Sequence, residues 1–355
     1  MMVNGFNKRV LSVLLSCLIM VNLAGCVGIG PRTVVRDRFD YVSAISSSWK
    51  QQLLLNLVKT RYADAPVFLD IVSVISQYVI EGQVQAGALW ADDPLGDSQS
   101  LGGAGKYTDR PTITYSPLLG EKFTKNLLTP IPVTGILFLL QSGYPADYVL
   151  RICVNSVNGV ENQYGNPLTG RAGDQDFFRM AAAVRNLQKN GSLGIRGDHS
   201  SVAVMFKNLK NEEIANDYRT IRDILGINPQ STEVKVVYGS FPENDREIAI
   251  LSRSMLQVLI DFSAYIDVPQ SDVNEGRVCP SAQSVWEDAA PMLQVKNSII
   301  KPGNAYVSVH YRNRWFWIDD RDYLSKRVFT FLLLLFSLTE TGADHAAPIV
   351  TVPTN

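Results

Sequence analysis

This sequence of 355 residues contains few histidines and cysteines, and its positive and negative charges nearly balance. The three histidines, His199, His310 and His345, are too few to favour a metal centre built mainly from imidazole ligands. Basic residues number 33 and acidic residues 34, so the chain lacks the basic excess that is typical of nucleic-acid-binding proteins. We therefore expect no metal site and no nucleic-acid partner.

Motifs that carry well-known catalytic mechanisms are also missing. The sequence contains no Walker A phosphate loop, no H-E-x-x-H, no G-x-S-x-G and no C-x-x-C. Ser47 and Lys50 match the S-x-x-K motif of penicillin-binding enzymes, but the S-D-N and K-T-G partners of that motif are absent. Ser47 fits the polar face of an amphipathic helix instead. These absences favour a non-enzymatic protein, and no cofactor is expected.

Hydrophobic runs long enough to cross a membrane are absent, and two shorter ones stand out. Val10–Val21 has twelve residues, which rise about 18 Å as a helix, whereas the hydrocarbon core of a bilayer is about 30 Å thick. Lys8 and Arg9 precede this run, and a positive start before a short apolar run is typical of an export signal. Val328–Leu338 is as short and is flanked by charges, which predicts a buried helix.

The residues that follow the first run carry the strongest signal in the chain. Leu23-Ala24-Gly25-Cys26 resembles the lipobox of bacterial lipoproteins. The resemblance implies cleavage before Cys26, a diacylglyceryl group on its sulfur and an acyl chain such as palmitate on its amino group. Val27 follows in place of the aspartate that often retains lipoproteins at the inner membrane, so the resemblance favours the periplasmic face of the outer membrane. A membrane is thus the first expected partner, through lipid on Cys26.

These signals divide the chain. We expect a lipoprotein signal peptide over 1–25, a lipidated tether over 26–38 and a single body over 39–355, with a candidate sub-boundary near 160–175, where the sequence is rich in Gly, Asn and Pro. Removal of residues 1–25 takes away Lys8 and Arg9 and no acid, which changes the net charge from −1 to −3.

Hydrophobic periodicity predicts an α+β fold with a mixed, mainly antiparallel sheet, amphipathic helices and a long β-hairpin. Alternating residues over 78–90 and again over 106–115 predict the two strands of the hairpin, which lies within 70–116. Further strands are predicted near 147–157, 193–196, 202–206, 234–238, 247–251, 293–300, 305–312 and 314–318. Helices are predicted near 40–62, 119–128, 132–142, 177–190, 212–225, 253–266 and 322–339.

Two cysteines remain after processing, because Cys17 is removed with the signal and Cys26 is acylated. In an oxidising compartment Cys153 and Cys279 are candidates for a disulfide. The predicted strand 147–157 places Cys153 on its polar face, within reach of a partner. The alternative is that both cysteines are buried and unpaired.

Aromatic and acidic residues near the C-terminus offer the remaining candidates. Trp315 and Trp317 share one face of a predicted strand, with Tyr311 expected beside them, and such a platform contacts a partner or ligand or packs on the sheet. Arg312 and Arg314 are expected to face solvent.

The acidic run Asp319–Asp322 fits either paired catalytic carboxylates or the start of a helix. His199 fits a loop histidine or a general base. Spacing identifies no nucleophile beside it.

Four segments resemble a group of uncharacterised proteobacterial proteins described only as lipoproteins. They are Asn56–Asp70, Leu127–Pro132, Gly143–Asp147 and Trp315–Arg327. The resemblance covers most of the mature chain and implies envelope location and one coherent body, but it supplies no catalytic residues.

Three functions remain in view at this point. The preferred one is a membrane-anchored envelope lipoprotein that binds or scaffolds an envelope protein partner without catalysis. The second is a tethered hydrolase of cell wall or polysaccharide. The third is a subunit of an oligomeric outer-membrane export pore that uses the 70–116 hairpin, because a membrane-crossing strand needs only about 9–11 residues.

Overall fold

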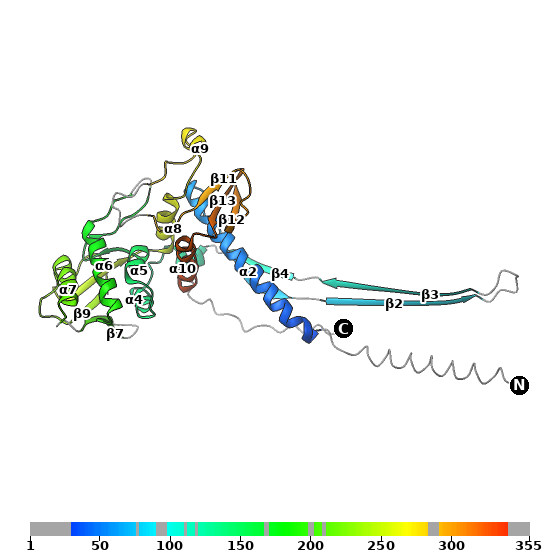
Figure 1. Ribbon diagram of the computed structural model, residues 1–355, viewed down its shortest axis with the longest axis horizontal. Helices are drawn as coiled ribbons and strands as arrows, with labels where there is room; N and C mark the ends of the chain where they lie inside the picture. Colours follow the sequence, from blue (N-terminus) through cyan, green and yellow to red (C-terminus); the bar gives the residue numbers. More distant parts are fainter. Residues whose placement is uncertain are drawn as a thin grey trace. The chain divides into compact units, whose positions relative to one another are not determined.

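The computed structural model describes residues 30–75, 78–89, 98–109, 112–117, 120–166, 170–197, 202–207, 211–282 and 291–339 (Figure 1). The predicted signal peptide, Cys26, His199 and His345 lie outside these residues. The chain forms two compact units, Met1–Gln52 and Leu53–Asn355.

Helix α2 is the first described element and runs from Gly30 to Arg61. It begins earlier than predicted, so part of the expected tether is helical. Pro31 suits the first turn of a helix, and no further proline or glycine interrupts the sequence before Arg61. Within the second unit, Leu54 and Leu57 of this helix are fully buried.

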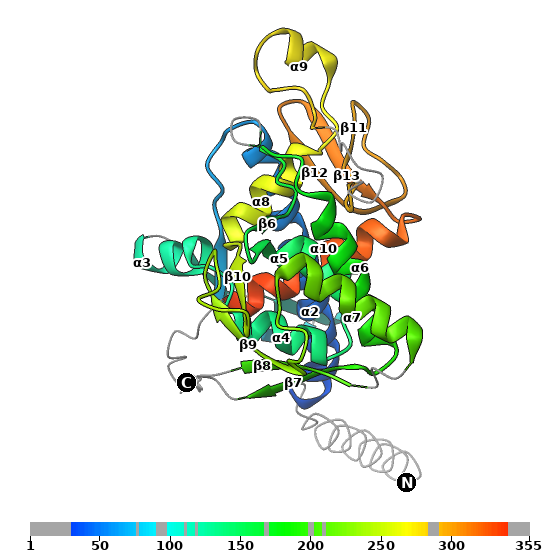
Figure 2. The same cartoon turned by 90° about the vertical axis from the view of Figure 1, so that its left-hand side faces the viewer.

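The predicted α+β class is confirmed, with mixed and mainly antiparallel sheets. One sheet has the strand order β6-β5-β10-β9-β8-β7, in which only β9 and β10 run parallel. Figure 2 shows β9, β8 and β7 side by side. A second sheet has the order β11-β13-β12 and is antiparallel throughout. The strands of these two sheets are β5 (Val154–Val157), β6 (Val160–Glu161), β7 (Leu193–Gly197), β8 (Val202–Phe206), β9 (Glu233–Tyr238), β10 (Glu247–Ser252), β11 (Lys296–Ser298), β12 (Ala305–Tyr311) and β13 (Arg314–Asp319).

Helices supply most of the remaining buried surface. The six-stranded sheet packs its apolar side chains against α4, α6 and α7, where Leu140, Met180 and Ile221 help to enclose an apolar core. The helices after α2 are α3 (Gly120–Phe123), the π-helix η1 (Thr124–Leu128), α4 (Val133–Gln141), α5 (Ala146–Cys153), α6 (Gln175–Lys189), α7 (Glu212–Leu225), α8 (Met255–Ala264), α9 (Gln270–Asn274) and α10 (Tyr323–Thr339).

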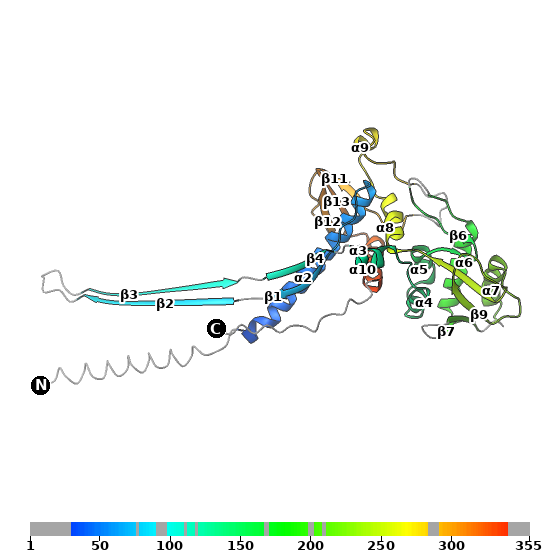
Figure 3. The same ribbon diagram turned by 180° about the vertical axis from the view of Figure 1, so that it is seen from behind.

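Two further strand pairs lie between α2 and α3. β1 (Leu69–Ile75) pairs with β4 (Thr112–Pro117), and β2 (Tyr78–Leu89) pairs antiparallel with β3 (Ser98–Asp109) along their whole length (Figure 3). The connection between β2 and β3, residues 90–97, lies outside the described residues, so the long hairpin itself stays a prediction.

The predicted strand over 147–157 is wrong in its first half, which forms helix α5. Pro145 occupies the N-cap with φ −56°, a value already close to that of a helix. Val149, Ile152 and Cys153 are spaced three and four apart, so they form one buried helical face, whereas Leu150, Ile152 and Val154 fit the alternation of a strand. Only β5, from Val154 onward, is extended.

The predicted buried helix near the C-terminus is confirmed as α10, whose Phe329, Leu332 and Leu335 are fully buried. Asp322 caps it, because its carboxylate accepts from the Ser325 amide at 3.0 Å and from the Ser325 hydroxyl at 2.6 Å. Within the described part of the chain, no helix is both long and apolar enough to cross a bilayer.

Candidate functional site

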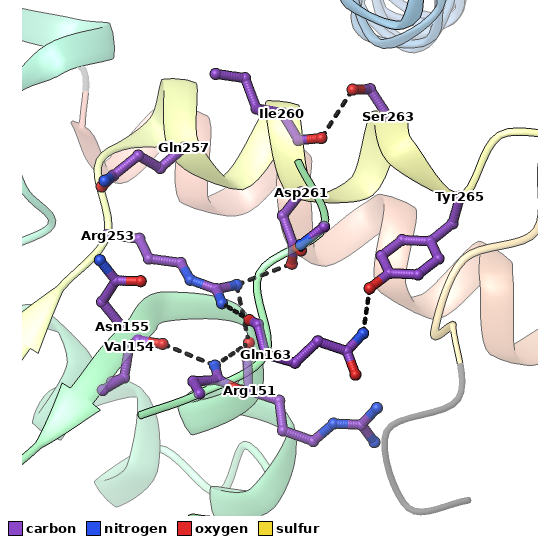
Figure 4. A network of polar contacts seen from close by, with 12 residues as sticks. Arg151, Val154, Asn155, Gln163, Arg253, Gln257, Ile260, Asp261, Ser263 and Tyr265 are labelled. Carbon is purple, nitrogen blue, oxygen red and sulfur yellow. Dashed lines mark hydrogen bonds and ion pairs between the residues drawn. The ribbon is translucent and has the colours of Figure 1, made fainter. Parts of the chain in front are cut away.

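A fully buried arginine, Arg253, lies between β10 and α8 and makes three side-chain hydrogen bonds. Its side chain is 0% exposed. Its Nη1 donates to Asp261 Oδ2 at 2.8 Å and to the Arg151 carbonyl at 3.2 Å, and its Nη2 donates to the Gln163 carbonyl (Figure 4). The backbone amide of Arg253 donates to the Cys153 carbonyl at 2.8 Å. One buried guanidinium therefore joins β10, α5, α8 and the loop after β6.

Asp261 completes this arrangement from the middle of α8. Its second carboxylate oxygen accepts from the Gly165 amide, so both oxygens are used. Burial raises the pKa of the Asp261 carboxyl above its usual range, while the adjacent Arg253 opposes that rise.

A second ring of hydrogen bonds holds residues 162–166 and 170–171, in the loop after β6, in place. Asn162 donates to the carbonyls of Arg151 and Val154, and the guanidinium of Arg171 donates to the carbonyl and side-chain oxygens of Asn155. Gln163 donates to the hydroxyl of Tyr265. The donors are directed at backbone carbonyls and at side chains within this set. We name the set of Arg253, Asp261 and this loop the Arg253 clamp, and we interpret it as structural.

The opposite side of α8 is hollowed. Two adjoining hollows of about 380 Å³ and about 340 Å³ share Leu256 and Ile260, which makes them one groove along the helix. We name it the α8 groove. Its remaining lining residues are Leu128, Pro130, Asn155, Tyr238, Leu251, Ser252, Ser254 and Gln257 in the first hollow, and Thr60, Arg61, Ala63, Asp64, Ala65, Ser263 and Ala264 in the second.

One polar atom in the groove lacks a partner. The hydroxyl of Ser252, a residue that is 3% exposed, is buried and makes no hydrogen bond in the described structure. Ser252 ends β10, two residues after Ile250, the register partner of Tyr238 at the end of the parallel strand β9. The carboxyl ends of parallel strands are common ligand-binding positions in α/β proteins. The first hollow therefore combines apolar walls with a buried group that is able to bind a donor or acceptor.

Arg61 is one of the residues that line the second hollow. This guanidinium is buried and donates to the Cys279 carbonyl at 2.7 Å, to the Ser281 hydroxyl at 3.4 Å and to the Ile266 carbonyl at 3.4 Å. Burial lowers the pKa of Arg61. Its donors are thus committed to the fold rather than to a ligand.

Trp315 and Trp317 lie together on one face of β13, as predicted, and both are half-buried. The Lys301 ammonium lies 5.2 Å from the ring centre of Trp315, and the Lys296 ammonium lies 5.2 Å from that of Trp317. The ring of His310 is 5.2 Å from that of Trp315. We name this side of the three-stranded sheet the tryptophan face.

Tyr311 is not part of that face. It pairs with Arg314 in the register, on the side of the sheet opposite Trp315. The reason is the tight turn at Arg312 and Asn313, whose φ values of 47° and 62° define a two-residue hairpin loop. Arg312 is not free in solvent either, because it forms an ion pair with Asp64 at 3.6 Å.

The acidic run after β13 serves the start of α10. Asp319 accepts from the Arg321 amide and pairs with Lys296 at 3.1 Å, and Asp320 pairs with Lys326 at 3.0 Å. The amide of Arg321 and the ammonium of Lys296 lower the pKa of Asp319. The described residues contain no group of three His, Cys, Asp or Glu side chains that could hold a metal ion.

The candidate disulfide between Cys153 and Cys279 is absent from the structure, where both thiols are free. Cys153 is the last residue of helix α5 and is buried, whereas Cys279 is exposed. The predicted pairing depended on a polar strand face at Cys153, and the structure has a helix there instead. Burial raises the pKa of the Cys153 thiol to about 12.

None of Arg253, Asp261 and Ser252 is among the candidate residues that the sequence predicts. A capping box at Ser254 and Gln257 marks the start of α8 and is readable in the sequence. No local pattern indicates that the preceding arginine is buried.

Comparison finds no match for this chain among protein-family models, curated proteins or solved structures. Function must therefore be inferred from the chain's own residues.

Proposed function

We propose that this protein is a lipoprotein of the outer membrane, anchored at the periplasmic face through lipid on Cys26, whose body binds an envelope protein without catalysis. The observation that carries the proposal is Leu23–Cys26 directly behind the apolar run Val10–Val21. A single buried acyl chain holds a protein only marginally, whereas two or more hold it stably. By its resemblance to a lipobox cysteine, Cys26 would carry three chains.

The α8 groove supports the binding part of the proposal. Its walls are largely aliphatic, at Leu128, Leu251, Leu256 and Ile260, and the unpartnered Ser252 hydroxyl lies among them. An extended segment of a partner, with apolar side chains and a backbone hydrogen-bonding group, matches these features.

The Arg253 clamp supports the same reading from the other side of the helix. It fixes α8 to β10 and α5 through buried hydrogen bonds. A groove on a fixed helix is formed before the partner arrives, so binding does not have to order it.

Mass spectrometry of the protein extracted from membranes tests the anchor. The expected N-terminus is Cys26 bearing acyl chains, and Cys26→Ser is expected to release the body from the outer-membrane fraction. A mature chain that starts elsewhere, or that is unacylated at Cys26, contradicts the anchor.

Site-specific photo-crosslinking in living cells tests the groove. A crosslinker at Leu256 is expected to give a discrete adduct with another envelope protein. The same crosslinker at Arg219, an exposed residue of α7 outside the groove, is the matched control. Identical adduct patterns from the two positions would contradict a specific site.

A second candidate, a subunit of an oligomeric export pore, is favoured by one observation. β2 and β3 form a separate two-stranded ladder of twelve residues each, longer than the 9–11 or so that a membrane-crossing strand needs. Measurement of the particle mass in detergent separates the candidates, because the pore requires a defined oligomer. No observation in the described structure favours the hydrolase alternative over these two.

A further inference from the structure

Two neighbouring isoleucines project from the loop after β11. Ile299 is 72% exposed and Ile300 is 80% exposed, the highest value among the large hydrophobic residues of the described structure. The hydroxyl of Ser298 donates to the Ile300 carbonyl at 2.8 Å, and Pro302 follows, so the loop backbone is held in a turn. Exposed aliphatic side chains normally occur singly. A fixed pair therefore indicates a surface that is covered in use.

The chain around this loop contains several basic residues, and Asp319 and Asp320 follow it directly. Residues 291–318 contain four basic residues and no acid, although the whole chain has a net charge of −1. Two of the four are paired with acids from elsewhere, Lys296 with Asp319 and Arg312 with Asp64. The other two, Lys301 and Arg314, form no ion pair within the described residues. Arg314 lies on the side of the sheet opposite Trp315, so Lys301 is the uncompensated positive charge beside the isoleucines.

Trp315 lies in the same row of the sheet. Its register partners are Ser298 on β11, which directly precedes the isoleucines, and His310 on β12. The ammonium of Lys301 lies against its ring. Tryptophan beside lysine is characteristic of the membrane–water interface, where the ring has one apolar and one polar environment.

We propose that Ile299, Ile300, Lys301 and Trp315 dock the body onto a phospholipid bilayer with anionic headgroups. The isoleucines enter the boundary of the acyl chains, and the Lys301 ammonium lies at the level of the headgroup phosphates. The inference rests on the proposed function, because lipid on Cys26 keeps the body near a bilayer. At the resulting high local concentration, a weak contact is sufficient to keep this face bound to the bilayer.

Charge and shape favour a bilayer over a protein as the occupant. Protein hot spots are central and seated in pockets, with aromatic or arginine anchors. Here the exposed apolar side chains are two adjacent isoleucines at the tip of a turn rather than in a pocket, and Lys301 beside them forms no ion pair within the described residues. That arrangement matches a phospholipid bilayer, in which anionic headgroups cover an apolar interior of acyl chains.

Vesicle co-sedimentation tests the proposal. The mature chain carrying Cys26→Ser, which has no lipid of its own, is mixed with vesicles of phosphatidylethanolamine and phosphatidylglycerol. The parent is expected to bind them, and Ile299→Ser with Ile300→Ser is expected to lower the partition coefficient about a hundredfold, at about tenfold per lost side chain. Lys301→Gln is expected to lower it about fivefold, and only at low salt.

Phe241→Ser is the matched control, since Phe241 is 75% exposed in the loop after β9 and should leave the partition coefficient unchanged. All these side chains lie on the surface, so unchanged thermal unfolding verifies that each variant is folded. Equal partitioning of the parent and the double isoleucine variant overturns the proposal. So does a lack of binding by the parent, or a crosslinker at Ile300 that captures a protein in cells and no lipid.

Failure of the anchor gives a different signature. An unacylated Cys26 would be seen by mass spectrometry of the native protein, whereas the vesicle assay uses an unlipidated chain and reads only the docking residues. If the unlipidated chain binds vesicles and the native protein proves to be unacylated at Cys26, the proposed anchor is wrong and the bilayer contact stands.

Discussion

Replacement of Arg253 by methionine should destabilise the fold more than any change at a surface ion pair. The variant leaves Asp261 buried beside an apolar side chain and removes the donors to the carbonyls of Arg151 and Gln163. Loss of one partner of a buried ion pair costs about 3–5 kcal/mol, and each carbonyl left without a donor adds about 1 kcal/mol or more. Since these contributions overlap, we expect a loss of about 4 kcal/mol.

Urea unfolding measures that loss. With an m value of about 3 kcal/mol per molar, the midpoint should fall by more than about 1 M. Arg277→Met is the matched control, because Arg277 pairs with Glu275 at 2.6 Å but both side chains are about half exposed, and such pairs contribute about 1 kcal/mol or less.

A double-mutant cycle decides whether the ion pair itself is responsible. Arg253→Met combined with Asp261→Leu leaves no buried charge, so the double variant should lose less than the two single losses together, by about 2 kcal/mol. Additive losses, or a loss below about 1 kcal/mol for Arg253→Met, would refute the clamp as we describe it.

Three further predictions concern the thiols and a helix cap. In the mature chain without lipid, Cys279 should react at once with a thiol reagent and Cys153 only in denaturant, because both are free and only Cys279 is exposed. Fast reaction of both thiols, or of neither, would contradict this assignment. Because burial raises the pKa of Cys153 to about 12, from about 8.5 in an unfolded chain, its contribution to stability is complete below pH 8.5 or so and falls by about 1.4 kcal/mol per pH unit above it. Urea midpoints measured at increasing alkaline pH should therefore fall less steeply in Cys153→Ala. Finally, Asp322→Ala should cost about 1 kcal/mol through the lost bonds to Ser325, measured in urea, and a smaller loss than for Asp320→Ala would argue against the cap.

Elements with strong periodicity and end signals are predictable from this sequence. For α7, Asn211 caps the helix by accepting from the Glu213 and Ile214 amides, and Gly226 ends it with φ 68°. Both signals are local, so they need no knowledge of the tertiary structure. Trp315 and Trp317 share a face for an equally local reason, the alternation of side chains along a strand.

Segments whose apolar residues satisfy two periods at once are not predictable in this way. Residues 147–157 fit a strand by alternation and a helix by the spacing of Val149, Ile152 and Cys153, and the sequence alone does not decide between them. The structure assigns the first part to α5, and the candidate disulfide fails with the strand. The prediction that Tyr311 lies beside Trp315 and Trp317 is wrong for a related reason. The length of the turn sets the register of the two strands, and the hydrophobic pattern does not fix that length.

Local sequence patterns do not predict the Arg253 clamp. Its hydrogen-bond acceptors at Gln163 and Arg151 are 90 and 102 residues away in the chain. Burial of a charged side chain depends on partners that only the folded chain brings together. A charged residue between an apolar strand and an apolar helix is the one available signal, and it does not distinguish a buried arginine from a solvated one.

The two faces of α8 connect stability with the proposed binding. Asp261 points to the clamp, while Leu256 and Ile260 line the groove on the other side of the same helix. A helix of ten residues is too short to be stable on its own in water, so its position depends on tertiary contacts. Because the clamp supplies buried contacts at both Arg253 and Asp261, it also fixes where the groove residues lie relative to Ser252. Substitutions in the clamp that leave the fold intact should therefore weaken groove binding without touching the partner, whereas substitutions at Ile299 and Ile300 should leave it unchanged.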